Sequence, residues 1–458
     1  MNKFNYANFF KPIIYIFQDK RTELVSIPDP EGEQKIGYFG LILNKLLSAN
    51  KVQEIKNVRL QKIEPMVNNS KIAILGTVGI PCSYGGFETV AENLVHYHFD
   101  KNHCSKLTVW CSKKNRADCP HSFKSANLRY VDLHANGCQS ILYDMVSLWQ
   151  AIRTGHDRIL LLGVSGALML PLVRVFSRAR IFTNIGGIEW KRRKWGKLAR
   201  VVLRASEWAA VRFSHELISD NQGISKYIHK TYGIDCNLIT YGGDHAVNPN
   251  IHSDNIHNEV YPNLPERFAL ALCRIEPENN IHIILEAFEG CDLPLVFVGN
   301  WDSSVYGKEL RIRYGNSSNL YLLDSIYEAT ILFALRNRAS IYIHGHSVGG
   351  TNPSLVEMMH FGIPVLAYDC EFNHYSTESK ALYFDSSAKL VELLNNLDAN
   401  KISLTGNDML KIAQRQYIWD EIGKSYFELI NQIQVDTKVY TFEDKQSLEM
   451  LPKICIKK

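Results

Sequence analysis

Short apolar runs alternate with longer amphipathic segments from residue 71 onward. The first run, 71–76, leads into a glycine-rich loop and then into a helix from about Phe87, with Val90, Ala91 and Leu94 at apolar or small positions. That spacing is typical of one buried helix face. Further strands are predicted at residues 107–110, 128–131, 158–162, 180–183 and 216–218. Strands that alternate with helix-length segments predict a parallel, doubly wound sheet.

The same pattern starts again after a polar stretch rich in asparagine and histidine, which we expect to be a linker. Strands are then predicted at 268–272, 295–298, 320–322, 340–343 and 364–367, with helices at 281–288 and 352–361. Two doubly wound α/β domains of similar size are expected to face a cleft at the carboxyl ends of their strands, where such folds bind ligands. The expected parts are an N-terminal extension of unknown role (1–70), a first Rossmann-like domain (71–245), the linker (246–263), a second Rossmann-like domain (264–416), a closing helix (417–436) and a tail (437–458).

Composition excludes several other classes of protein. At 458 residues and 46% hydrophobic, the chain can bury two cores, and its net charge of +4 does not suggest nucleic-acid binding. Its ten cysteines are scattered without a CxxC pair, which predicts free thiols in a reducing cytoplasm and no metal site. The apolar stretch 159–173 is interrupted by Gly163, Gly166 and Pro171, and therefore predicts a buried strand, a turn and a helix start instead of a membrane span.

The candidate chemistry is concentrated in the segment 344–364, which reads as strand end, glycine loop and helix. Gly349 and Gly350 let the backbone approach a ligand closely, and the helix start that follows suits a phosphate. Glu357, about one turn into the helix, can accept two hydrogen bonds from a vicinal diol such as a ribose. The alternative is an ordinary connection in a parallel sheet. The amides and hydroxyls expected at the helix start belong to Thr351, Asn352 and Ser354.

A second candidate loop begins at Arg274, directly after the predicted strand that starts at residue 268. An arginine at the carboxyl end of a strand points toward the same cleft and can clamp a diphosphate. The alternative is a surface salt bridge to Glu276 or Glu278. In the first domain, the loop at Gly85 and Gly86 matches neither the GxGxxG nor the P-loop pattern, so neither a nicotinamide cofactor nor ATP is expected, and the sequence has no DxD triad for a metal-bound diphosphate.

Together, the segments 349–364, 274–280 and 76–88 resemble the retaining GT-B glycosyltransferases that use nucleotide sugars. More narrowly, they resemble the bacterial rhamnosyltransferases of capsule and cell-wall polysaccharide synthesis. The resemblance covers about residues 71–430. Further stretches that are similar to this branch are Gly187–Arg192 with Lys194–Trp195, Ile218–Asn221 with Gly223–Ile224, Tyr241–Asp244, Val305–Lys308, Leu322–Tyr327 and Phe372–Asn373.

The resemblance implies an acceptor domain followed by a nucleotide-sugar domain, and transfer with retention, without metal or cofactor. It implies that Arg274 neutralises the donor diphosphate, that Glu357 binds the ribose, and that Gly85 and Gly86 bring amides to the diphosphate. Residues 323–326 are expected to flank the base. The other candidates for donor binding are Asn279, Asn280, Ile326, His346, Gly349, Gly350, Thr351, Asn352 and Ser354.

Three positions depart from the pattern of these enzymes. Gly349 stands where the wider superfamily has an acidic residue for the donor sugar, and Asn279 stands where it usually has lysine. Both departures resemble the rhamnosyltransferase branch, and we interpret them as donor specificity. Gly186 stands where that branch has aspartate. An alternative interpretation is therefore a catalytically silent GT-B protein that binds glycans or assembly partners.

The segment 190–204 is basic and contains tryptophan. On a helix its cations follow a 4,3,4 spacing and share one face, which suits an anionic membrane surface or a lipid diphosphate; the alternative is a solvated helix face. Glu189 is a catalytic candidate that could orient an acceptor hydroxyl, or it could pair with Lys191 or Arg192. The candidates on this acceptor or membrane side are Glu189, Trp190, Lys191, Arg192, Arg193, Lys197, Arg200 and Arg204.

The expected activity is transfer of a hexosyl group, L-rhamnose from dTDP-rhamnose, to a lipid-linked saccharide in surface polysaccharide synthesis. The catalytic candidates are Glu189, Arg274 and Glu357. Another nucleotide sugar such as UDP-glucose is the alternative donor. The expected location is the cytoplasm, peripheral at the inner face of a bacterial membrane.

Overall fold

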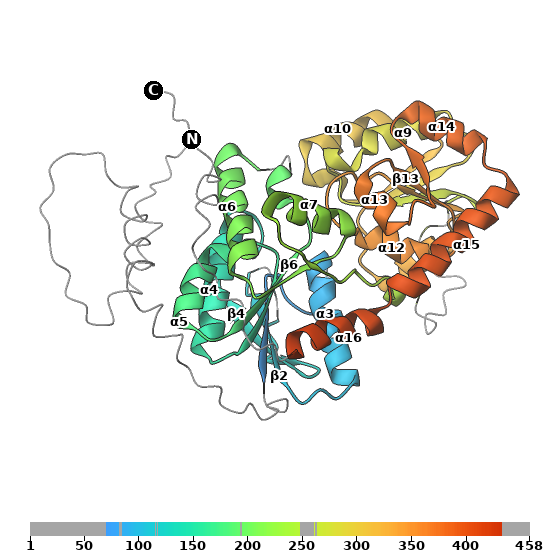
Figure 1. The fold of residues 1–458 in the computed structure, drawn as a ribbon. Helices are drawn as coiled ribbons and strands as arrows, with labels where there is room; N and C mark the ends of the chain where they lie inside the picture. The colour runs from blue at the N-terminus through green and yellow to red at the C-terminus, as the bar shows by residue number, and fades with distance from the viewer. Residues whose placement is uncertain are drawn as a thin grey trace, which may run out of the picture. The chain divides into compact units, whose positions relative to one another are not determined.

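A computed structural model describes residues 70–81, 85–114, 116, 118–192, 195–247, 261 and 263–432 (Figure 1). The chain divides into two compact units, Met1–Glu64 and Pro65–Lys458, and every described residue belongs to the second unit. The expected N-terminal extension, most of the linker, Arg193 and the expected tail lie outside the described residues.

The first domain is built on an eight-stranded sheet in the order β3-β4-β2-β1-β5-β6-β7-β8. All neighbouring strands are parallel except the pair of β3 and β4. The run predicted at 158–162 is strand β5 with the same bounds. The strands are β1 Lys71–Leu75, β2 Lys106–Ser112, β3 Ser122–Phe123, β4 Ala126–Val131, β5 Arg158–Leu162, β6 Arg180–Ile185, β7 Glu216–Ser219 and β8 Asn237–Leu238.

Helices connect these strands, as the alternating pattern predicted. In the first of them Val90, Ala91 and Leu94 are buried, which confirms the predicted apolar face. The stretch 159–173 is a strand, a one-turn 3-10 helix and the start of an α-helix, as expected. The helices are α3 Gly86–Asp100, α4 Ser140–Arg153, α5 Leu170–Phe176, α6 Lys197–Phe213 and α7 Gln222–Tyr232, with one-turn helices η5 Ala167–Met169 and η6 Glu189–Lys191.

The second domain has a six-stranded parallel sheet in the order β11-β10-β9-β12-β13-β14. Its strands are β9 Ala269–Leu272, β10 Leu295–Val298, β11 Leu320–Leu323, β12 Ile341–His344, β13 Val365–Tyr368 and β14 Leu382–Phe384. Its helices are α9 Ile281–Glu289, α10 Val305–Tyr314, α11 Ala329–Arg338, α12 Pro353–Met359, α13 Glu371–Ser376, α14 Ser387–Asn395 and α15 Ala399–Gln416, and α16 Trp419–Asn431 closes the described chain.

Each sheet has a point where the strand order reverses. Strand β1 lies between β2 and β5, and strand β9 lies between β10 and β12. In open parallel sheets the crevice for ligands forms at the carboxyl ends of the strands at such a point. The loops after β1, β9 and β12 therefore occupy the positions where ligands are expected, and these are the loops that carry Gly85, Arg274 and Gly349.

The chain returns to the first domain at its end. Helix α16 packs along α3 (Figure 1), and Arg158 donates a hydrogen bond to the carbonyl of Ile430 at 2.7 Å. Asn184 Nδ2 donates to the hydroxyl of Tyr426 at 2.5 Å. One hydrophobic cluster includes buried residues of both sheets and of α16.

The segment that leads out of the first sheet lies against the start of this return. The amide of Gly243 donates to the carbonyl of Tyr417 at 2.8 Å, and the hydroxyl of Thr240 donates to the carbonyl of Gln416 at 2.8 Å. The amide of Trp419 donates to Asp244 Oδ1 at 2.9 Å. Two segments that are far apart in the sequence thus run side by side between the domains.

The contact of α16 with α3 can be tested at Gly423. A Cβ atom at this position would lie 2.4 Å from Cγ of Tyr97, so Gly423→Val forces the aromatic ring or the helix to shift. We expect the free energy of unfolding in urea to fall by about 1–3 kcal/mol. Gly290→Val is the matched control, because a Cβ there meets nothing within 4 Å in the described part of the chain. Equal stability of the two variants would contradict this packing.

Candidate functional site

The two glycines of the loop after β12 are closely covered by side chains of the protein itself. Gly349 has a φ of +132°, and a Cβ there would lie 3.0 Å from Nε2 of His346. A Cβ at Gly350 would lie 1.9 Å from Oδ1 of Asp220, which belongs to the first domain. The loop therefore needs glycine at both positions, and at Gly350 the reason is a carboxylate from the opposite domain.

The polar groups at the start of α12 hold the helix in place. Oδ1 of Asn352 accepts a hydrogen bond from the amide of Ser354 at 3.1 Å and from its hydroxyl at 2.8 Å. The hydroxyl of Tyr342 donates to Ser354 Oγ at 2.9 Å, and the hydroxyl of Thr351 donates to the carbonyl of Asp220 at 2.5 Å. These side chains were expected to face a ligand, and in this structure they cap α12 and join it to the first domain.

Glu357 is buried, and both of its carboxylate oxygens have partners. Oε2 pairs with the guanidinium of Arg336 on α11, and Oε1 lies 3.3 Å from Nε2 of His245. Burial raises the pKa of the carboxyl, but Arg336 and His245 outweigh it, so the pKa of Glu357 is lowered and the group is ionised at neutral pH. The expected ribose ligand is thus a carboxylate that is held in place by two basic side chains.

Arg274, Asn279 and His346 come together at the carboxyl ends of β9 and β12. Asn279 Nδ2 donates to the carbonyl of Arg274 at 2.7 Å, and its Oδ1 lies 2.6 Å from Nδ1 of His346. The guanidinium of Arg274 lies 3.7 Å from Glu276 Oε1, so the alternative salt bridge is present. Asn279 therefore joins the loop after β9 to the loop after β12.

His346 lies close enough to an arginine of each domain for their charges to lower its pKa. Burial, followed by the charges of Arg192 and Arg274, lowers the pKa of His346 to about 3. The imidazole is therefore neutral near pH 7, and the two guanidinium groups supply the positive charge around it. Such a concentration of cations between two domains suits an anionic ligand.

Gly85 and Gly86 begin α3 at the carboxyl end of the first sheet. Gly85 has a φ of +123°, and a Cβ at Gly86 would lie 3.6 Å from Cγ of Pro353 at the start of α12. Glu88 supports this turn, because its Oε1 accepts a hydrogen bond from the amide of Val78 at 2.6 Å. The two glycine loops that the sequence singled out therefore lie next to each other.

Glu189 is paired within its own segment. Its Oε2 lies 2.9 Å from Nε of Arg192, and its Oε1 accepts a hydrogen bond from the indole of Trp195 at 3.0 Å. Of the two roles considered for Glu189, the structure shows the pairing with Arg192. Trp190 lies beneath cations, with Arg204 5.3 Å and Lys191 5.6 Å from the centre of its ring.

The exposed side of α6 carries both cations and apolar side chains. Lys197, Arg200 and Arg204 are exposed there, and so are Leu198 and Val201. The expected basic face is present at these three residues, and large apolar side chains lie among the cations.

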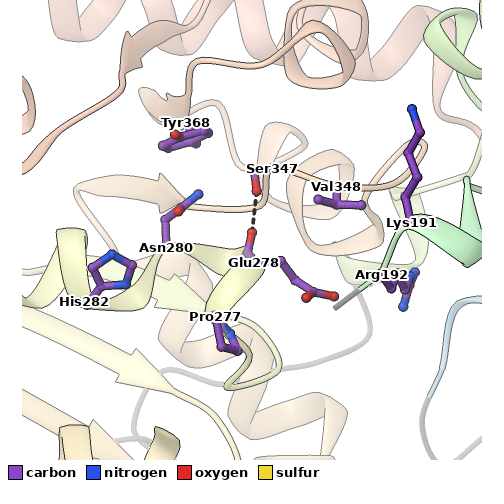
Figure 2. A pocket seen from close by; sticks show the side chains of 9 residues that line it. All are labelled: Lys191, Arg192, Pro277, Glu278, Asn280, His282, Ser347, Val348 and Tyr368. Carbon is purple, nitrogen blue, oxygen red and sulfur yellow. Dashed lines mark hydrogen bonds between the residues drawn. The ribbon is translucent and has the colours of Figure 1, made fainter. Parts of the chain in front are cut away.

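A cavity of about 320 Å³ lies between the domains (Figure 2). Lys191 and Arg192 approach it from the first domain, and Asn280 and Val348 approach it from the second. Across its floor the hydroxyl of Ser347 donates to the carbonyl of Glu278 at 2.7 Å. The nine lining residues are Lys191, Arg192, Pro277, Glu278, Asn280, His282, Ser347, Val348 and Tyr368.

Comparison with known proteins gives matches for both domains. Residues 253–397 match the model for glycosyl transferases group 1, and residues 69–244 match a domain of unknown function, DUF1972. No curated protein sequence matches the chain.

Solved structures match the chain across both domains. Sucrose-phosphate synthase from Thermosynechococcus elongatus is 14% identical with a TM-score of 0.66, over 79% of this chain and 98% of that one. Anabaena Alr3699/HepE in complex with UDP is 14% identical with a TM-score of 0.58, over 80% and 100%. A trehalose-6-phosphate protein from E. coli, bound with UDP-2-fluoro glucose, is 10% identical with a TM-score of 0.57, over 80% and 100%.

The chain has the GT-B fold and a glycosyltransferase group 1 domain. The predicted fold class is confirmed. In this GT-B fold the cavity lies between the two Rossmann-like domains, beside the loops after β9 and β12.

Several residues near the cavity and the glycine loops were not among the site residues proposed from the sequence. Tyr368 ends β13 and Asp220 directly follows β7, so a search of strand ends would have found both. Arg336 carries no such signal, because only the packing of α11 beside α12 brings it to Glu357. Ile326, expected near the base, is half-buried after β11 and packs against the hydrophobic core; it is not among the residues that line the cavity.

Removal of Arg336 is expected to destabilise this GT-B chain strongly. Arg336→Met leaves the buried carboxylate of Glu357 without its main partner, which costs about 3–5 kcal/mol of unfolding free energy. In a Glu357→Gln background the same change should cost much less, because no charge is left to compensate. Urea unfolding of the native chain, both single variants and the double variant measures this difference; additive effects would contradict a direct pair.

The pair also predicts a pH dependence. The folded pKa of Glu357 is lowered, so its contribution to stability is complete above the pKa of an unfolded glutamate, about 4.3. The contribution is lost as the pH falls from there through the folded pKa. The stability difference between the native chain and Arg336→Met should therefore shrink below about pH 4.

Proposed function

We propose that this protein transfers L-rhamnose from dTDP-rhamnose to a lipid-linked saccharide in surface polysaccharide synthesis. The observation that carries the proposal is the cavity between the two domains, with Lys191 and Arg192 on one wall and Asn280 on the other. A nucleotide sugar is anionic at its diphosphate, and fixed cations stabilise the charge that develops on a departing diphosphate. Relatives of the same fold are complexed with UDP and with UDP-glucose, which supports a nucleotide sugar as donor.

Arg274 and Arg192 neutralise the diphosphate in this proposal, and the amides at Gly85 and Gly86 approach it from the first domain. Glu357 binds the ribose through Oε1, because His245 at 3.3 Å is a looser partner than the guanidinium of Arg336 on Oε2. Asn279, Asn280 and Thr351 keep the surrounding loops in position. The reaction needs no metal, since the arginines supply the positive charge.

The transfer proceeds on one face of the sugar. The bond between the anomeric carbon and the diphosphate oxygen breaks, and its electron pair leaves with the diphosphate. The acceptor hydroxyl forms the new bond on the same face, and its proton passes to the departing phosphate oxygen. Retention of configuration follows.

The donor is proposed to be a 6-deoxy sugar because of the surroundings of Gly349. The imidazole of His346 lies where a side chain at residue 349 would begin, so this position offers no carboxylate to a sugar hydroxyl. A 6-deoxy sugar presents one hydroxyl fewer. UDP-glucose remains the alternative donor, because it is bound in a relative of the same fold.

Contact with a membrane surface is the second part of the proposal. Val175 and Phe176 at the end of α5 are 65% and 63% exposed, and Leu198 and Val201 on α6 are 68% and 52% exposed. Helices α5 and α6 pack against each other (Figure 1), and Arg200 lies exposed among these side chains on α6. Apolar side chains next to cations suit the surface of an anionic bilayer.

Such a contact puts the reaction at the inner face of a bacterial membrane, where a lipid-linked acceptor is available. No helix in the described part of the chain combines the length and the apolar character that a membrane span requires. The proposed contact is therefore peripheral and is made by the sides of α5 and α6.

Arg274→Ala should weaken binding of dTDP-rhamnose by roughly 1.5–3 kcal/mol, the value of a charge-assisted hydrogen bond. Isothermal titration calorimetry, preceded by a thermal-shift panel of nucleotide sugars, measures the effect. Arg313→Ala is the control, because Arg313 lies on α10 against the ring of Tyr314, whereas Arg274 lies beside Asn279 in the loop after β9. Unchanged affinity in Arg274→Ala would contradict the donor site. If the protein binds a nucleotide sugar but releases no nucleoside diphosphate in the presence of any lipid-linked acceptor, the result would favour a silent glycan-binding protein.

Charge reversal on α6 tests the membrane contact. The double variant Arg200→Glu, Arg204→Glu removes about 1 kcal/mol of attraction per cation, so binding to phosphatidylserine vesicles should fall roughly 30-fold or more in a sedimentation assay. Lys411→Glu on α15 changes an exposed charge of the second domain and serves as the control. Equal vesicle binding by all three proteins at low salt would rule out this face.

A further inference from the structure

Asp220 lies where the two domains meet, at the carboxyl end of β7. Its Oδ1 would be 1.9 Å from a Cβ at Gly350, and its Oδ2 would be 3.5 Å from a Cβ at Gly186. Glycine at 350 allows the carboxylate to lie against the loop backbone of the second domain. Because residue 186 is glycine, no side chain covers the other side of the carboxylate. The ring of Phe87 lies nearby, 3.1 Å from the position of a Cβ at residue 186.

One of the two carboxylate oxygens of Asp220 accepts no hydrogen bond from the described residues. Oδ1 is buried and makes no hydrogen bond with any residue that the structure describes. Burial raises the pKa of Asp220 to about 7, although the amides of Thr351 and of Asp220 itself lower it in part. The titratable groups that face it are the phenols of Tyr417 and Tyr426, whose pKa values burial raises, so both are neutral. A buried carboxylate oxygen without a hydrogen bond costs stability, which makes a functional role the better explanation for Oδ1.

Three other carboxylates near the two glycine loops already have partners. Glu357 is held by Arg336 and His245, and Glu189 by Arg192 and Trp195. Glu88 accepts hydrogen bonds from the amide of Val78 and the hydroxyl of Thr77. Hydroxyl groups of a sugar need acceptors, and an ionised carboxylate offers the strongest ones.

We propose that Asp220 accepts hydrogen bonds from hydroxyls of the transferred sugar and so orients and selects the donor from the first domain. This rests on the proposed use of a nucleotide sugar. Asp220 then supplies the carboxylate that neither Gly349 nor Gly186 can supply, and the ring of Phe87 offers an apolar surface beside it. Because the ionised group is the stronger hydrogen-bond acceptor, donor affinity should rise with pH through about 7.

The test compares binding of a nucleoside diphosphate with binding of its nucleotide sugar, using dTDP with dTDP-rhamnose and UDP with UDP-glucose. In Asp220→Asn, which preserves size, nucleoside diphosphate affinity should be unchanged and nucleotide-sugar affinity should fall roughly 10- to 100-fold. The rise in nucleotide-sugar affinity between about pH 6 and 8.5 should disappear with it. Asp235→Asn is the control, because the side chain of Asp235 is 90% exposed and pairs with His229 on the surface of the first domain.

The outcomes separate the two proposals. A native protein that binds neither nucleoside diphosphate nor nucleotide sugar contradicts the proposed function itself. Native binding of both, with unchanged sugar affinity in Asp220→Asn, overturns the role of Asp220 alone. An equal loss for both ligands assigns Asp220 a purely structural role in holding the loop, and also overturns it. If the variant does not fold, a native nucleotide-sugar affinity that is constant over the same pH range overturns the proposal without it.

Discussion

The return of α16 to the first domain is the interaction on which the two-domain arrangement depends. Tyr426 and Trp419 are buried in a cluster that also contains the apolar faces of both sheets. The chain therefore has a hydrophobic core that continues from one domain to the other. Burial of this kind contributes roughly 25 cal/mol per Å² of apolar surface, and it opposes separation of the domains that form the site. The core holds the domains together beside the polar cleft, and hydrogen bonds such as that of Thr351 to the carbonyl of Asp220 add to it.

Two carboxylates in the cleft are paired with basic side chains. Glu189 is neutralised by Arg192, and Glu357 by Arg336 and His245. His346 stays neutral, since burial and the nearby guanidinium groups lower its pKa. Asp220 differs from these two, because its carboxylate lies against Gly350 and Gly186. In the proposed function, the arginines meet the diphosphate of the donor and Asp220 accepts hydrogen bonds from its sugar.

The sequence was sufficient for the fold and for the loops that carry the site. Short apolar runs such as 158–162 and 295–298 fixed strand positions, since a strand buried on both faces has few alternatives. Arg274 and the glycine loop could be linked because both follow strands of one parallel sheet. Helix α15 was not predicted, because Gly406 and the polar residues after it resemble a turn. In the structure Gly406 allows close packing, as a Cβ there would lie 2.2 Å from the carbonyl oxygen of Gly362.

The partners of the site residues could not be predicted. Glu357 meets Arg336 and His245 only because α11, α12 and the segment after β8 converge, and no periodicity along one segment reports that. The same holds for Asp220 and Gly350, which lie in different domains. The sequence shows where strands end. Tertiary packing decides which side chains at those ends already have a partner within the protein. The role of each donor-site residue accordingly stays a prediction.

The paired segments at Gly243 and Tyr417 have a mechanical consequence. The segments around Gly243 and Tyr417 both connect the two domains and run side by side like the two edges of a narrow strap. The hydrogen bonds between them keep one segment from sliding along the other. A strap of this kind bends readily about one line and resists twist about others. A rotation of the Rossmann-like domains that bends this strap would change the distance between Arg192 and Arg274, and between Asp220 and Gly350, at the same time.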